Sequence, residues 1–138
     1  MFVDGHINES GAPIYAAASG KVVFADTDGL YGHTVVIYHG TFTISTEGKY
    51  LYTFYGHMGN KATGDSYITV EKEDSLFAGQ KIGRQGNSGY TTGATGIHLD
   101  WEIRLGKYID KIGTMKFYGA KLGMWRTWFV PARKPFAI

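Results

Sequence analysis

Apolar and polar residues alternate along much of this chain, which is the pattern of strands with one buried face. The clearest case runs from His98 to Leu105, where every second residue is apolar. Residues two apart in a strand share a face, so His98 and Asp100 lie together on the polar side of this strand. That polar face is where we expect chemistry.

The same pattern predicts further short strands joined by glycine-containing turns. They are expected at residues 13–24 (two strands separated by a hairpin-type turn at Ser19 and Gly20), 33–40, 49–57, 67–70 and 80–85. We therefore predict an all-β fold, an antiparallel sheet folded into a partly open barrel or sandwich, over residues 1–107. Residues 108–138 mix large apolar side chains with glycines, and we expect an irregular C-terminal extension packed on the domain or docked on another subunit.

The amino-acid composition excludes several classes of functional site and partner. The 138 residues include 20 glycines and no cysteine, so disulfides, thiolate metal sites and cysteine nucleophiles are excluded. The net charge of +2 is small and dispersed, and we expect no nucleic-acid partner. No apolar run approaches the roughly 20 residues that span a bilayer, and the start of the chain has no leader pattern, so we expect no membrane span and no signal peptide.

Several segments, in uninterrupted order from Val3 to Ile103, resemble the lysostaphin-type zinc metalloendopeptidases, which cut peptide cross-links of bacterial peptidoglycan. The matching segments are Gly11–Ala16 with Ser19–Val23, Tyr31–Ile37, Tyr55–Met58, Ala78–Gly83 with Gly86–Gly89, and Gly96–Glu102. The resemblance implies the duplicated hybrid motif fold, a zinc cofactor and a cell-wall peptide substrate. Carried over residue by residue, it places His57 and His98 in the two proton-handling positions and Asp4 in a metal-ligand position.

The chain departs from the family pattern at the positions of the metal ligands. The first ligand histidine would lie four residues before Asp4, ahead of Met1, and Asp100 stands where the family has its third ligand, a histidine. A catalytic zinc ion normally has three protein ligands. Asp4, His6 and Asp100 would supply three if both segments are extended, with a harder donor set that tolerates manganese or other divalent ions. Against this, His6 can be an ordinary solvated residue, and Asp100 can pair with a histidine or with Arg104.

Two functions therefore stay open at this point. One is a peptidoglycan endopeptidase with an impaired or lost zinc site, in which His98 accepts a proton from water and His57 stabilises the oxyanion. The other is a catalytically silent peptidoglycan-binding or structural module, for example of a phage tail. We expect either one to act at the bacterial cell wall, for example as part of a phage particle. His33 and His39 occupy positions that are not metal sites in the family, and we expect them to be structural.

Overall fold

Within residues 10–44, 47–91, 96–111 and 114–126, which this computed structural model describes, the chain forms β strands and no helix. The all-β prediction is confirmed. The strands are β1 (Pro13–Tyr15), β2 (Gly20–Asp28), β3 (Gly32–Ile44), β4 (Glu47–Gly56), β5 (Ser75–Leu76), β6 (Lys81–Arg84), β7 (Asp100–Lys111) and β8 (Thr114–Arg126).

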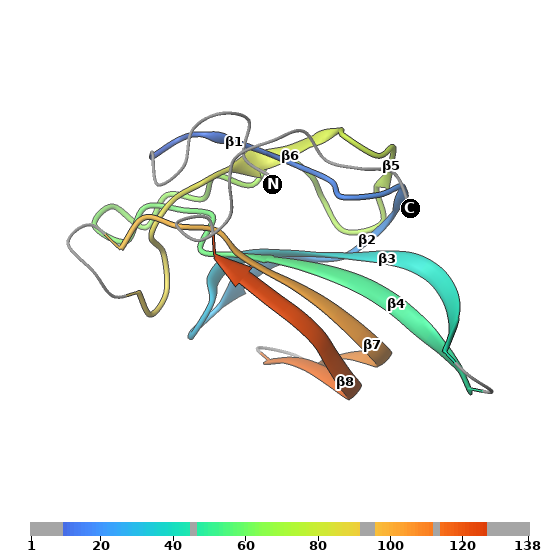
Figure 1. Cartoon of the computed structure of the whole chain (residues 1–138). Coiled ribbons are helices and arrows are strands. Elements are labelled where there is room, and N and C mark those ends of the chain that lie inside the picture. The colour runs from blue at the N-terminus through green and yellow to red at the C-terminus, as the bar shows by residue number, and fades with distance from the viewer. Residues whose placement is uncertain (1–9, 45–46, 92–95, 112–113, 127–138) are drawn as a thin grey trace.

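The strands build two antiparallel sheets rather than a closed barrel. The large sheet has the order β5-β2-β3-β4-β7-β8, and the small sheet pairs β1 with β6. Figure 1 shows the small sheet lying across one face of the large one. Hairpins join β3 to β4 and β7 to β8, whereas β4 reaches β7 only after the chain has visited β5 and β6. As a result, the end of β4 pairs with the start of β7, with Gly56 opposite Asp100, although the two residues are far apart in the sequence.

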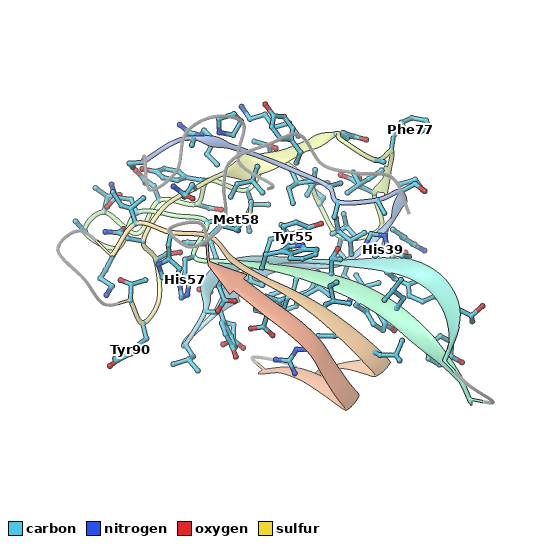
Figure 2. The ribbon with its side chains drawn as sticks, in the orientation of Figure 1. His39, Tyr55, His57, Met58, Phe77 and Tyr90 are labelled. Carbon is cyan, nitrogen blue, oxygen red and sulfur yellow. The ribbon has the colours of Figure 1, made fainter. Side chains whose placement is uncertain are left out.

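The main core fills the space between the two sheets. Alternate residues of the central strands point into it, as the period-two pattern requires, and their apolar side chains are removed from water. Tyr55 and Met58 lie in this layer (Figure 2). The buried members are Ala12, Ile14, Ala16, Ala17, Val22, Val35, Ile37, Tyr55, Met58, Val70, Leu76, Ile82, Leu99 and Trp101.

The opposite face of the large sheet carries a second, smaller apolar cluster formed by Phe24, Val36, Tyr52 and Phe54. Charged residues continue this face onto β7, because Phe54 pairs with Glu102 and Tyr52 pairs with Arg104. Three alternate residues of β7 therefore share this face, and we call them the polar row: Asp100, Glu102 and Arg104.

Three local expectations differ from the structure. The strands at 13–15 and 20–28 form no hairpin, because β1 pairs with β6 and β2 pairs with β3 and β5. Residues 67–70 make only an isolated bridge from Ile68 to Gly83 in place of a strand. Residues 114–126 form the strand β8, with one register shift opposite Ile103 and Arg104, rather than an irregular segment. Glycines that interrupt a helix can be accommodated in a paired strand.

Candidate functional site

His57 lies immediately after β4, in a backbone conformation that L-residues rarely adopt. Its φ is 64°, in the left-handed region where a non-glycine residue costs conformational energy. Its N–H donates to the carbonyl of Tyr31 at 2.7 Å, and its ring Nδ1 contacts the carbonyl oxygen of Ser88 at 2.7 Å. A carbonyl can only accept, so Nδ1 carries the proton and Nε2 is turned toward the polar row.

His98 lies two residues before β7, in an isolated bridge with Gly86. Its Nδ1 donates to the carbonyl of Gly96 at 2.9 Å, which fixes the second imidazole in the same way as the first. The ring centroids of His57 and His98 are 4.5 Å apart, although 41 residues separate them in sequence. The structure thus brings together the two histidines that the sequence pattern singled out.

Asp100, the first residue of β7, completes a buried cluster with these histidines. Its Oδ2 lies 4.0 Å from Nε2 of His57. His57, His98 and Asp100 are all buried, with 4%, 3% and 3% of their surface exposed. We call these three residues the site cluster. A carboxylate facing an imidazole in a poorly solvated position can orient it and balance a charge on it.

Two glycine-containing loops hold His57 in place, and sequence reasoning did not single them out as functional. Ser88 provides both the carbonyl bound by His57 and a hydroxyl that accepts from the N–H of His33 at 3.0 Å. Gly32 and Gly89 have φ of 67° and 79°, and a Cβ on either would overlap main-chain atoms of the other loop. The contact of His57 with the Ser88 carbonyl leaves no signal in the sequence, because it does not depend on the identity of a side chain. The one signal for these loops was that both glycines lie within the segments that resemble the family.

Tyr31 links the site cluster to the polar row. Its ring packs edge-on against Phe54 at a centroid distance of 4.7 Å and lies 6.3 Å from the ring of His57. Burial raises the pKa of the Tyr31 phenol, and the carboxylates of Glu102 and Asp100 raise it further. The guanidinium of Arg104 has the opposite, smaller effect, and the phenol therefore stays protonated.

The two remaining described histidines lie outside the site cluster. Nε2 of His33 contacts the carbonyl of Gly64 at 3.2 Å. His39 is at the other end of the large sheet from His57 (Figure 2). Its Nδ1 donates to the carbonyl of Ser19 at 2.7 Å, and its Nε2 contacts the hydroxyl of Thr53 at 2.6 Å. Both side chains thus make hydrogen bonds within the fold.

Zinc does not fit the described residues by themselves. A catalytic zinc ion needs three protein ligands, and no group of three His, Cys, Asp or Glu side chains in the described part of the chain is arranged to hold a metal. Asp100 is the described member of the predicted ligand set Asp4, His6 and Asp100. Asp4 and His6, the other two predicted ligands, lie outside the described residues.

Comparison with known proteins shows the family to which this fold and site cluster belong. The model of Peptidase family M23 matches residues 5–111. The chain belongs to peptidase family M23. This match takes in β1 to β7 and ends before β8, so the M23 segment contains the whole site cluster.

Individual M23 relatives agree with this assignment. The peptidoglycan DD-endopeptidase ShyA of Vibrio cholerae is 34% identical over 93 residues, which are 67% of this chain and 17% of ShyA. A zinc-containing peptidase from Vibrio cholerae superposes with a TM-score of 0.53 at 29% identity, covering 69% of this chain and 24% of that one. The catalytic domain of lysostaphin from Staphylococcus simulans gives a TM-score of 0.54 at 25% identity, covering 79% and 68%.

These relatives bear directly on the sequence-based expectations. The resemblance to lysostaphin-type peptidases is confirmed, and the family includes peptidases named for peptidoglycan and for zinc. The chain spans only a small part of the length of ShyA. Across the described ranges of this M23 chain, the structure has no helix of the length and hydropathy that a bilayer span requires.

Proposed function

We propose that this M23 domain binds and acts on the peptide cross-links of bacterial peptidoglycan, with a zinc site weakened by Asp100. The observation that carries the proposal is the site cluster itself, in which two imidazoles and a carboxylate meet in a buried position. The relative named as a peptidoglycan endopeptidase supports the substrate class. The carboxylate at a position where the family has a histidine supports the weakened metal site.

The proposed roles of the two histidines follow from which ring nitrogen carries the proton. His98 donates its Nδ1 proton to Gly96, so its neutral Nε2 can accept a proton from a water molecule near a peptide carbonyl. His57 has committed its Nδ1 proton to Ser88, so it can donate to a developing oxyanion only when Nε2 is protonated as well. Asp100, at 4.0 Å, would balance the charge of that imidazolium.

The metal ligands form a separate part of the proposal. Asp4 and His6 together with Asp100 would give a set of two carboxylates and one imidazole, a harder set than one rich in histidine. Such a set would hold zinc weakly and would accept manganese or a similar ion. Metal-dependent cleavage would then be slow, or lost.

A second candidate function is a catalytically silent module, such as a structural part of a phage tail, that retains peptide binding. The replacement of a ligand histidine by Asp100 favours it. The two candidates share the bound substrate and differ in whether the peptide bond breaks.

Incubation with purified peptidoglycan sacculi separates the candidates. The bound fraction is measured by sedimentation and released peptides by mass spectrometry, with added Zn²⁺ or Mn²⁺ and with chelator. We expect binding in every condition, with slow, metal-dependent release of peptides. The His57→Ala and His98→Ala variants should lose release, whereas His33→Ala, which lies outside the site cluster, should retain it. Binding without release under any metal condition would favour the silent module, and absence of binding would contradict both.

A further inference from the structure

The polar row places an arginine beside the site cluster, on the same face of β7. Nε of Arg104 donates to Oε1 of Glu102 at 2.7 Å, and Nη2 lies 2.6 Å from the same oxygen. Both contacts use one edge of the planar guanidinium, which carries five N–H donors in all. The guanidinium is therefore held over Glu102, two residues along the strand from Asp100.

The two partners of this pair differ in their contact with water. The side chain of Glu102 is fully buried, whereas that of Arg104 is 20% exposed. A buried carboxylate that fixes a partly exposed guanidinium leaves a rigid cation at the surface, with little conformational entropy to lose on binding. Tyr31 is a neighbour of both regions, since its ring lies 6.3 Å from that of His57 and packs against Phe54, the residue that pairs with Glu102.

From this arrangement we infer that Arg104, positioned by Glu102, binds a free carboxylate of the peptide held at the site cluster. Arginine is the residue best suited to a carboxylate, because its fork matches the two oxygens. Two residues of strand measure about 7 Å. A bound extended peptide also advances by about 3.3 Å per residue, so the carboxylate would lie about two or three residues from the peptide bond at His57 and His98. This subsite rests on the proposed function.

The test compares pairs of synthetic peptides that mimic a cross-link and differ in one group. One member of each pair carries a free carboxylate two or three residues from the central bond, on either side, and the other carries a carboxamide there. Affinities for the full chain are measured by calorimetry. We expect one carboxylate peptide to bind at least about tenfold more tightly than its amide partner.

Variants assign that preference to Arg104. Arg104→Gln should bind both members of the pair equally, and Arg104→Lys should keep only part of the preference, because it retains the charge without the fork. If the single change prevents folding, the double variant Glu102→Gln/Arg104→Gln removes both charges while preserving volume. Arg84→Gln is the matched control, since Arg84 stacks on Tyr67 at 4.4 Å in another part of the fold.

The outcomes separate this inference from the proposed function. Equal binding of carboxylate and amide peptides by the unchanged chain would overturn the inference and leave peptide binding intact. A preference that survives in the Arg104→Gln or the double variant would also overturn it. If neither the peptides nor sacculi bind the unchanged chain, the proposed function fails as well.

Discussion

Asp100 faces His57 across the junction of β4 and β7, with 4.0 Å between the carboxylate and Nε2. The family resemblance leads one to expect an imidazole at this position of β7. A carboxylate differs from an imidazole in charge and in softness as a metal ligand, so it changes both the metal preference and the electrostatic environment of His57. The identity of residue 100 is therefore the feature on which activity should depend most.

Replacing Asp100 by histidine should strengthen zinc binding. The change restores a borderline-soft nitrogen ligand in a buried position, and we expect zinc affinity to rise by at least about tenfold. Metal content after equilibrium dialysis against buffered zinc, measured by mass spectrometry, gives the answer. Asp100→Asn, which removes the charge without adding an imidazole, is the control and should not bind zinc more tightly. Equal zinc content in both variants would mean that Asp4 is not positioned as the resemblance implies.

The contact between the loops of Gly32 and Ser88 should be sensitive to a single methyl group. A Cβ on Gly32 would overlap the main chain at Ser88, and the residue has a φ of 67°. We expect Gly32→Ala to lower the free energy of unfolding by about 1–3 kcal/mol, measured by chemical denaturation. Gly29→Ala is a close control, because a Cβ there meets nothing within 4 Å, and its effect should stay within about 0.5 kcal/mol. Similar effects of both changes would contradict the tight contact.

The hydrogen-bond chain at His39 should make the fold sensitive to acid. Neutral His39 donates to Ser19 and accepts at Nε2 from Thr53, whose oxygen is 2.9 Å from the hydroxyl of Tyr55. Burial lowers the pKa of His39, and this outweighs the opposite effect of the Ser19 hydrogen bond. The unfolded chain therefore takes up this proton at a higher pH than the folded chain does.

It follows that the contribution of His39 to stability is complete above pH of about 6.5. That contribution decreases as the pH falls toward the folded-state pKa, with a slope of at most about 1.4 kcal/mol per pH unit for one proton. Urea denaturation from pH 7 to pH 5, compared between the unchanged chain and His39→Gln, isolates this residue from other titrating groups. The variant should show a shallower loss of stability. Parallel curves would contradict the assignment.

Removal of the C-terminal residues should test how the two predicted segments, 1–107 and 108–138, depend on each other. β8 pairs with β7 from Asp100 to Lys111, so deletion of residues 111–138 removes the neighbour of the strand that carries Asp100. We expect a lower melting temperature for a chain that remains monomeric, measured by calorimetry and by mass in solution. Deletion of residues 127–138 alone keeps β8 and serves as the comparison. Loss of assembly would indicate a partner instead, and a stable monomer unchanged by the larger deletion would contradict both expectations.

The alternation of apolar and polar residues was sufficient to predict the central strands. Burial on one face imposes a period of two on a strand, so β3, β4 and β7 are visible in the sequence itself. The motif segments, read through the family resemblance, predicted that Asp4, His57, His98 and Asp100 lie around one site; the last three do lie close together, and Asp4 is outside the described residues. Pro13–Tyr15 was correctly placed as a strand as well.

Only the tertiary structure decided which strands pair and which groups meet. β1 and β6 pair across a long sequence separation, and such contacts depend on the packing of whole sheets rather than on local preference. The Ser88 carbonyl that fixes the ring of His57 has no sequence signature, because every residue carries a carbonyl. The sequence determined which side chains are available for chemistry. The geometry of the site cluster was decided by the packing of the Gly32 and Ser88 loops against the end of β4, because the contacts of His57 join residues far apart in the chain.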